Sequence, residues 1–278
     1  MDGYEKLAFG NSVIMNIILL TNYDFASLVA LNLLMPRLND HQLLIGLSDK
    51  VGGNQKRPRA LTELAHFENE LIKTIVRATH PLLLSDLNQR FSAKEIGSFE
   101  KISHQYQTEI VQLSNINQSS DIVRVKNFKP DVILSIRFGK ILQQPVIDIP
   151  RYGIINLHSG MLPEYQGVMA TFWAMLNGAQ SIGTSLHFIS DSNIDNGEII
   201  LESKMPLEKD KSYLHNVIAL YHSGCQNMLS AVNRLQNGQP LISYPQQGKA
   251  CYYGFPTEQD LDKFYQMGFQ LFNEKEFV

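Results

Sequence analysis

The stretch GIINLHSG, residues 153–160, places two polar side chains inside an apolar run of strand length. Successive side chains of a β-strand point to opposite faces, so Asn156 and His158 point to the same side. Ile155 and Leu157 point to the other side, where they can anchor the strand in an apolar layer. The pattern therefore predicts a buried strand that presents a carboxamide and an imidazole side by side.

Apolar runs of strand length recur along the chain, separated by segments with helical spacing. Buried runs that alternate with helices are typical of a parallel sheet covered by helices, so we expect an α/β, Rossmann-like, mainly parallel sheet. We place this domain at 14–207 and a small helical C-terminal extension at 208–278. The further strand predictions are 13–20, 42–48, 130–136, 183–190 and 197–207.

Helix predictions rest on apolar stripes and on residues that begin or end helices. A first helix contains Phe25 to Leu34, with Pro36 marking its end, and a second helix covers 60–78. Ser92 fits the N-cap of a later helix. A short apolar helix fits 168–178, and the tail after 208 reads as two helices.

The composition is that of an ordinary globular protein, with 278 residues, 44% hydrophobic residues and a net charge of −3. This charge gives no basic footprint for nucleic acid. Two cysteines, Cys225 and Cys251, are too few for a disulfide framework or a zinc cluster. The longest apolar run, 13–20, contains Asn16 and is short of the ~20 residues that span a bilayer. We therefore expect a cytoplasmic protein with no membrane association and no metal.

A third polar residue, Asp195, lies in the loop sequence DSNIDNG between two predicted strands. A carboxamide can hold a developing oxyanion without titrating, and an imidazole can move a proton near neutral pH. A carboxylate beside the imidazole fixes its tautomer. Together Asn156, His158 and Asp195 suit the attack of an amine on a carbonyl. Taken one by one, they would equally fit hydrogen-bonded buried groups and a turn residue.

The spacing of the surrounding motifs decides between these interpretations. Residues 156–200 read NLHSGMLPEYQGVMATFWAMLNGAQSIGTSLHFISDSNIDNGEII. This order of N-x-H, Leu-Pro, G-T-x-x-H and D-x-G-x-I-I resembles the catalytic core of the folate-dependent formyltransferases. That family includes glycinamide ribonucleotide transformylase, methionyl-tRNA formyltransferase and the sugar N-formyltransferases. The resemblance implies the formyltransferase fold and an enzyme that uses 10-formyltetrahydrofolate as co-substrate.

The resemblance also implies roles for individual residues. Asn156, His158 and Asp195 match the catalytic residues, while the role of His158 as a base or as an electrostatic partner stays open. Segment 135–142 matches the part that holds the pterin ring, and loop 189–197 matches the part that closes over it. The implied folate contacts are Arg137, Phe138, Gly139, Lys140, Ile141, Leu142, Ile189, Asp191, Asn193 and Ile194. No metal is implied.

The acceptor is the weakest inference. The sequence TNYDFAS, 21–27, contains no glycine for a phosphate-binding loop, which disfavours glycinamide ribonucleotide transformylase. The tail 208–278 has a charge balance of −1 from six Lys/Arg and seven Asp/Glu, whereas a tRNA-binding module should be basic. We therefore favour a small-molecule amine, a nucleotide-linked amino sugar, with methionyl-tRNA as the alternative. A non-catalytic folate-binding module is the alternative of another class.

Several residues are candidates for acceptor binding or assembly. Tyr23, Tyr165 and Trp173 are the predicted substrate-binding residues, although Trp173 would equally fit a helix core. The basic residues Lys56, Arg57 and Arg59 fit a pyrophosphate site or, equally, a solvated loop. Segment 252–257, YYGFPT, fits a subunit interface or the mouth of a pocket. Homodimer formation is an open alternative.

Overall fold

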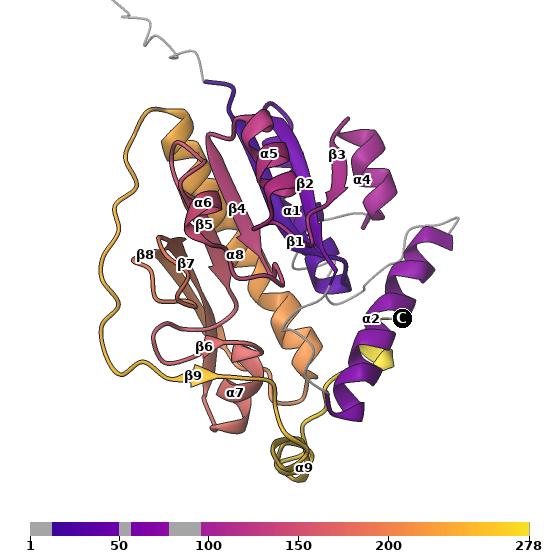
Figure 1. Cartoon of the computed structure of the whole chain (residues 1–278). Coiled ribbons are helices and arrows are strands. Elements are labelled where there is room, and N and C mark those ends of the chain that lie inside the picture. The colour runs from indigo at the N-terminus through magenta and orange to yellow at the C-terminus, as the bar shows by residue number, and fades with distance from the viewer. Residues whose placement is uncertain (1–12, 50–56, 78–95, 278) are drawn as a thin grey trace, which may run out of the picture.

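The computed structural model describes residues 13–49, 57–77 and 96–277. Within these residues, seven strands form one sheet in the order β3-β2-β1-β4-β5-β7-β8 (Figure 1). The pairings from β3 to β5 are parallel, and β7 and β8 are added antiparallel. The prediction of a mainly parallel α/β sheet is confirmed. The strands are β1 (Asn16–Asn22), β2 (Gln42–Ser48), β3 (Glu109–Gln112), β4 (Val132–Ile136), β5 (Ile154–His158), β7 (Ser181–Ile189) and β8 (Ile199–Pro206).

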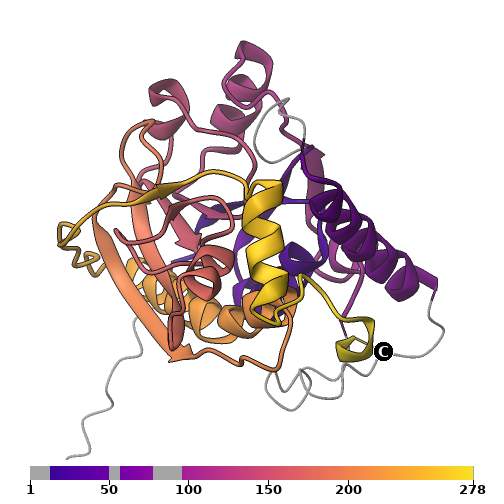
Figure 2. The ribbon, with the colours of Figure 1, turned by 90° about the horizontal axis from the view of Figure 1, so that it is seen from below.

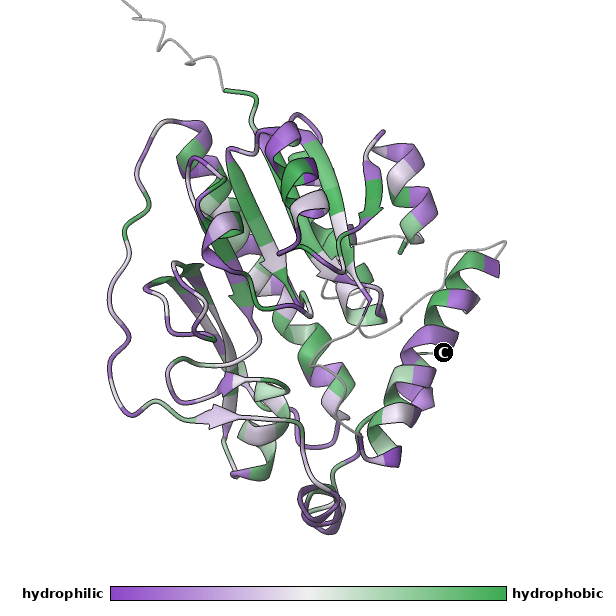
Figure 3. Cartoon of the chain, in the orientation of Figure 1, coloured by the Kyte–Doolittle hydropathy of each residue, from purple (hydrophilic) through white to green (hydrophobic). Residues whose placement is uncertain are grey.

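Helices cover both faces of the sheet, because each central strand alternates apolar residues between two layers. Ile17 and Leu19 of β1 belong to the larger apolar cluster with α1 and α8, whereas Ile18 and Leu20 belong to the cluster with α5 and α6. The central strands are accordingly hydrophobic, while α2 and α9 carry many hydrophilic residues (Figure 3). The helices are α1 (Phe25–Leu38), α2 (Arg59–Arg77), α4 (Phe99–Gln105), α5 (Ser119–Phe128), α6 (Gln144–Ile147), α7 (Ala170–Leu176), α8 (Tyr213–Gln236), α9 (Glu258–Gln266) and the 3-10 turn η1 (Glu274–Glu276).

The helix predictions are confirmed in part. Helix α2 matches the predicted 60–78 closely, but Pro36 lies inside α1, which continues to Leu38. A proline in the last turn removes one hydrogen-bond donor without forcing the helix to end at once. Asp24 begins α1 by accepting a hydrogen bond from the backbone N–H of Ser27. The predicted N-cap Ser92 and the basic residue Lys56 lie outside the described residues.

The two helices predicted after residue 208 are present as α8 and α9. Helix α8 packs against α1 and against the β7 and β8 strands, within the larger apolar cluster. Helix α9 packs against α7 on the lower side of the molecule, where the rings of Phe264 and Phe172 are 4.5 Å apart (Figure 2). The domain boundary at residues 207 and 208 stays a prediction.

A long connection joins α8 to α9 along the outer side of β8 (Figure 1). It carries the two-residue strand β9 (Tyr252–Tyr253), which pairs in parallel with β6 (Gln166–Gly167). This small second sheet was not predicted. It ties the connection to the segment that follows β5. None of the helices in the described residues combines the length and apolar character needed to cross a bilayer.

Candidate active site

Strand β5 presents the two polar residues as predicted. It pairs with β4 on one side and with β7 on the other, so that Asn156 lies opposite His187 and His158 opposite Ser185. Ile155 and Leu157 point into the larger apolar cluster and are buried. The strand is therefore fixed from behind, and Asn156 and His158 share its other face.

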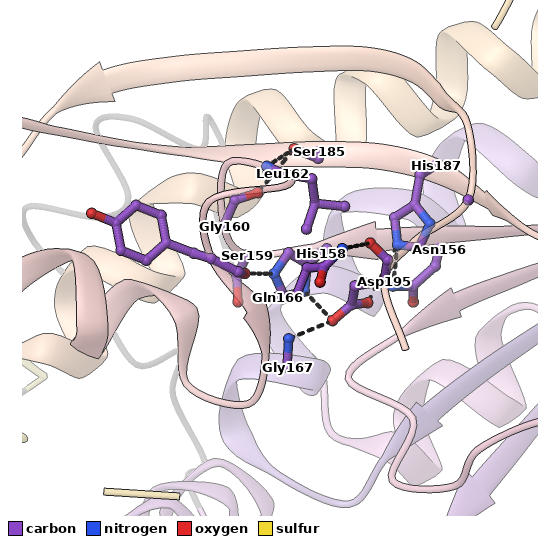
Figure 4. A network of polar contacts seen from close by, with 12 residues as sticks. Asn156, His158, Ser159, Gly160, Leu162, Gln166, Gly167, Ser185, His187 and Asp195 are labelled. Atoms are coloured by element: carbon purple, nitrogen blue, oxygen red, sulfur yellow. Dashed lines mark hydrogen bonds and ion pairs between the residues drawn. The ribbon is translucent and has the colours of Figure 1, made fainter. Parts of the chain in front are cut away.

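The loop between β7 and β8 brings Asp195 to this face (Figure 4). The Oδ2 atom of Asp195 lies 3.4 Å from Nδ1 of His158, and its Oδ1 atom lies 3.4 Å from Nε2 of His187. The backbone N–H of Gly167 donates to Asp195 Oδ2 at 2.8 Å. The three residues singled out in the sequence are thus brought together, although 37 residues separate His158 from Asp195 along the chain.

The surroundings of Asp195 favour its charged form. Burial alone would raise the pKa of this carboxyl, but His158, His187 and the N–H of Gly167 together lower the pKa to about 2. Opposite charges and donated hydrogen bonds both stabilise a carboxylate over its protonated form. A fixed negative charge therefore lies beside both imidazoles.

The hydrogen bonds of His158 define what its ring can do. Its Nε2 atom lies 2.6 Å from the backbone oxygen of Tyr165, and its Nδ1 atom faces the carboxylate of Asp195. A carbonyl oxygen and a carboxylate can only accept hydrogen bonds. The His158 ring therefore lies between two acceptor groups, the Tyr165 carbonyl and the Asp195 carboxylate.

His187, the histidine of the G-T-x-x-H motif, completes the polar network, although the sequence analysis assigned it no role. Its Nδ1 atom lies 2.9 Å from the backbone oxygen of Phe188, and its Nε2 atom lies 3.1 Å from Nδ2 of Asn156. Its side chain is 2% exposed. The signal was available, because His187 is a polar residue inside the predicted strand 183–190. Its partner was not, because the β5–β7 register is a property of the fold.

The predicted folate segment follows β4 at the carboxyl edge of the parallel strands. The Gly139 N–H donates to Ser48 Oγ at 2.9 Å, and Lys140 pairs with Asp49 at 2.8 Å. Ile141 is 53% exposed, whereas Leu142 is 3% exposed and packs in the smaller apolar cluster. Phe138 is half-buried beside them. The segment thus presents one exposed apolar side chain above a buried apolar base.

Arg137, the first residue after β4, is directed elsewhere. It adopts a left-handed backbone conformation with φ 57°, and its guanidinium pairs with Asp24 at 3.0 Å. The same group lies 4.0 Å from Glu68 of α2. Arg137 therefore ties β4 to the start of α1 and to α2.

The loop before Asp195 contains the remaining predicted folate contacts. Ile189 is half-buried against the smaller apolar cluster, and Ile194 is 36% exposed. Asp191 accepts a hydrogen bond from the backbone N–H of Asn193 at 2.7 Å, which forms a local turn. These residues lie on the segment that carries Asp195, and their contact with folate stays a prediction.

The predicted acceptor residues fall into two groups. Tyr23 is 44% exposed and stacks on Phe99, with ring centroids 4.6 Å apart. Tyr165 and Trp173 both stack against Tyr253, at 5.9 and 4.9 Å. Tyr253, from the segment 252–257 noted in the sequence, thus joins two of the predicted acceptor residues in one aromatic cluster beside β6.

Two of the three predicted basic residues lie in the described part of the chain. The Arg57 guanidinium lies 4.5 Å from the centroid of the Phe255 ring. Arg59 pairs with Glu63 at 2.7 Å on the surface of α2. Their role toward a pyrophosphate stays a prediction. No group of three or more metal-ligating side chains suited to an ion occurs in residues 13–49, 57–77 and 96–277.

Comparison with known proteins gives the family of the chain. A family model described as "Formyl transferase" matches residues 40–220. The methionyl-tRNA formyltransferase of Syntrophomonas wolfei is 26% identical over 194 residues, covering 68% of this chain and 62% of that protein. The corresponding protein of Clostridium beijerinckii is 30% identical over 155 residues, covering 55% of this chain and 49% of that protein. The chain thus spans about half to three fifths of these relatives.

Solved structures show the same fold at low sequence identity. Glycinamide ribonucleotide transformylase 1 from Symbiobacterium toebii has a TM-score of 0.58 at 13% identity, covering 87% of this chain and 99% of that one. The N-formyltransferase from Helicobacter canadensis has a TM-score of 0.53 at 15% identity, covering 89% of this chain and 72% of that one. With the family model matched over more than half of its length, the chain belongs to the formyl transferase family.

Proposed function

We propose that this protein is a folate-dependent N-formyltransferase that moves a formyl group from 10-formyltetrahydrofolate to a primary amine. The observation that carries the proposal is the juxtaposition of Asn156, His158 and Asp195 on one face of β5. Family membership supports the reaction class. The Helicobacter canadensis neighbour is described in complex with folinic acid and dTDP-3-aminofucose, which supports a folate co-substrate.

The residues after β4 fit a flat, largely apolar donor. Ile141 offers an exposed apolar side chain, while Phe138 and Leu142 belong to the smaller apolar cluster. The backbone of Gly139 is fixed by Ser48, so the segment is held in shape before any ligand arrives. We place the pterin ring against residues 138–142, with loop 189–194 on the other side.

Formyl transfer requires an unprotonated amine to attack the formyl carbon. A new carbon–nitrogen bond forms, the bond to N10 of the folate breaks, and the amine proton is passed to N10. The side-chain amide of Asn156, which lies 3.1 Å from Nε2 of His187, would donate an N–H to the oxyanion. In this proposal Asp195 orients His158, and the two residues relay the amine proton to N10, with His158 as the base or as the electrostatic partner of that transfer.

For the acceptor, a nucleotide-linked amino sugar is the first choice and methionyl-tRNA the second. The tail 208–278 has six Lys/Arg against seven Asp/Glu, which does not suit a partner with many phosphates. Tyr252 is 60% exposed beside the aromatic cluster of Tyr165, Trp173 and Tyr253, where it could stack on a base. The sequence relatives named methionyl-tRNA formyltransferases keep the second choice open. Cytoplasmic location and homodimer formation stay predictions.

The test is steady-state formylation with 10-formyltetrahydrofolate and three acceptor classes: amino-sugar nucleotides, free amino acids and methionyl-tRNA. We expect Asn156→Ala to lower kcat by about 10²- to 10³-fold, as for the loss of one oxyanion donor. His158→Ala and Asp195→Ala should also lower it strongly. Matched controls are Asn69→Ala, His66→Ala and Asp262→Ala, which remove exposed side chains of α2 and α9.

Two results would overturn parts of the proposal. A wild-type protein that binds the folate yet neither transfers nor hydrolyses its formyl group would make it a folate-binding module. Efficient formylation of methionyl-tRNA, with the amino-sugar nucleotides inert, would replace the favoured acceptor while leaving the reaction intact.

A further inference from the structure

The connection between α8 and α9 contains a segment that is bonded at both ends to the core of the protein. We call residues 243–253 the strap. At one end, Tyr244 exchanges two backbone hydrogen bonds of 2.9 Å with Ile199 of β8. At the other end, Cys251 donates its backbone N–H to the oxygen of Pro163 at 3.0 Å and accepts from the N–H of Gln166 at 2.9 Å. Gln246 lies between these two attachments.

The side-chain amide of Gln246 contacts both the loop that carries Asp195 and Gln166 of β6. Its Nε2 atom donates to the backbone oxygen of Asp195 at 2.8 Å and to that of Gly197 at 2.9 Å. Its Oε1 atom accepts from Nε2 of Gln166 at 3.3 Å. An amide group has two N–H donors and one oxygen acceptor, so each part of the group is engaged.

Gln166 repeats the contact from the other side. Its Nε2 atom donates to the same Asp195 oxygen at 3.0 Å, and its side chain is buried. The Asp195 carbonyl therefore receives two amide donors, one from β6 and one from the strap. The next backbone N–H, that of Gly167, holds the Asp195 carboxylate at 2.8 Å. Both polar ends of Asp195 are fixed by neighbouring elements.

Asp195 needs this support because its backbone is in the left-handed region, with φ 53°. That conformation is unfavourable for a residue with a Cβ atom and persists where surrounding contacts enforce it. Relaxation of the backbone would rotate the carboxylate away from His158 and His187. The hydrogen bonds to the carbonyl and the aim of the carboxylate are therefore linked through one residue.

We propose that Gln246 is a positioning residue, which holds the Asp195 loop so that the carboxylate faces His158. The catalytic consequence rests on the proposed formyl transfer, while the structural part concerns the loop alone. Gln246 lies beyond residues 40–220, the part of the chain that the family model matches. The proposal therefore gives the strap, which lies outside the matched region, a role in positioning the loop that carries Asp195.

Two substitutions separate hydrogen bonding from shape. Gln246→Met keeps the length of the side chain and removes its donors and acceptor. Gln246→Glu keeps the shape but places an oxygen, in place of the Nε2 donor, against the two backbone oxygens of Asp195 and Gly197. The control is Gln247→Met, which makes the same change at the exposed neighbour in the strap.

The first readout is hydrogen–deuterium exchange of peptides from 190–198 in the ligand-free protein. We expect faster exchange in Gln246→Met and Gln246→Glu than in wild type and Gln247→Met. The second readout is steady-state formyl transfer, in which kcat should fall by about 10- to 100-fold while KM for the folate changes little, because a misplaced catalytic group costs rate.

The outcomes are distinguishable. Unchanged exchange at 190–198 in both Gln246 variants overturns the proposal whether or not the protein is active. Faster exchange with wild-type kcat overturns the positioning role. Faster exchange in a protein whose wild type shows no formyl chemistry leaves the loop contact standing and overturns the proposed function instead.

Discussion

The Nδ1 atom of His158 lies 3.4 Å from Oδ2 of Asp195, and the two side chains are only 8% and 10% exposed. Burial weakens the screening of charges by water, so the Asp195 carboxylate and the ring facing it interact more strongly than exposed side chains would. The carboxylate lies between this imidazole and that of His187, which explains why its pKa falls to about 2 despite burial. The arrangement proposed for catalysis therefore also favours the charged form of Asp195 in the folded chain.

Asp195→Asn should lower stability in a pH-dependent way. Because the pKa of Asp195 is depressed from 3.8 to about 2 on folding, its charge stabilises the folded chain above about pH 4. That contribution is lost as the pH falls toward 2. From the pKa difference we expect wild type to exceed the variant by about 2 kcal/mol at pH 6. Urea unfolding of wild type and Asp195→Asn at pH 6 and at pH 3.5 measures this difference in free energy.

The difference in free energy of unfolding between wild type and Asp195→Asn should be smaller at pH 3.5 than at pH 6. Asp262→Asn, a change on the exposed surface of α9, serves as control and should show no such narrowing. A gap that is the same at both pH values would mean that the charge of Asp195 does not contribute through the two imidazoles.

His187→Leu should lower kcat by about 10- to 100-fold, because it frees the carboxamide of Asn156. The His187 ring contacts Asn156 at 3.1 Å and Asp195 at 3.4 Å, so one substitution loosens two residues of the proposed catalytic set. Loss of the contact with the half-buried Asn156 amide should also cost about 1 kcal/mol of stability. Steady-state kinetics and thermal unfolding measure the two effects. His104→Leu on the exposed side of α4 is the control, and wild-type turnover of His187→Leu would contradict the network.

The fold and the central site were predictable from sequence because they depend on local patterns. Alternation within β5 put Asn156 and His158 on one face, and apolar runs separated by helices indicated a parallel sheet. The motif order then pointed to Asp195. These signals are readable without knowing which strands are neighbours in the sheet.

The parts that were missed depend on pairings between distant segments. His187 meets Asn156 only through the antiparallel β5–β7 register, and Gln246 meets Asp195 only because the strap joins β6. A strand of two residues, such as β9, leaves no periodic pattern to read. The burial of Glu68 was also not predicted, although this residue lies on the same side of α2 as the buried residues Leu64 and Leu71.

The Glu68→Gln variant should become increasingly stable relative to wild type as the pH rises. Burial, followed by repulsion from Asp24, raises the pKa of Glu68 from 4.5 to about 7, and Arg137 opposes this only in part. The folded chain therefore binds this proton more tightly than the unfolded chain, and stability falls as the pH rises from about 5 to 8. A glutamine at this position keeps an oxygen for the Ala26 N–H and cannot ionise.

Between pH 5 and pH 8, the free energy of unfolding of Glu68→Gln should rise relative to that of wild type by on the order of 2 kcal/mol. Urea unfolding at the two pH values checks this. Glu63→Gln on the exposed side of α2 is the control, because solvent screens that carboxylate. A constant difference over this range would show that Glu68 is already ionised at pH 5.

The Gly167→Ala variant tests the contact between β6 and β9, because the Gly167 N–H also donates to the Asp195 carboxylate. Gly167 has φ 97°, and a Cβ atom there would lie 2.2 Å from the backbone oxygen of Tyr253. An alanine must therefore push β9 away from β6 and shift the N–H that holds Asp195.

Gly178→Ala is the matched control, because Gly178 has φ 76° but open space around its Cβ position. Both variants should lose about 1 kcal/mol for the left-handed backbone. Only Gly167→Ala should lose a further ~1–3 kcal/mol through overpacking, together with most of its kcat. Urea unfolding and formyl transfer measured on both variants decide the matter, and equal losses would mean that the β6–β9 junction does not support the site.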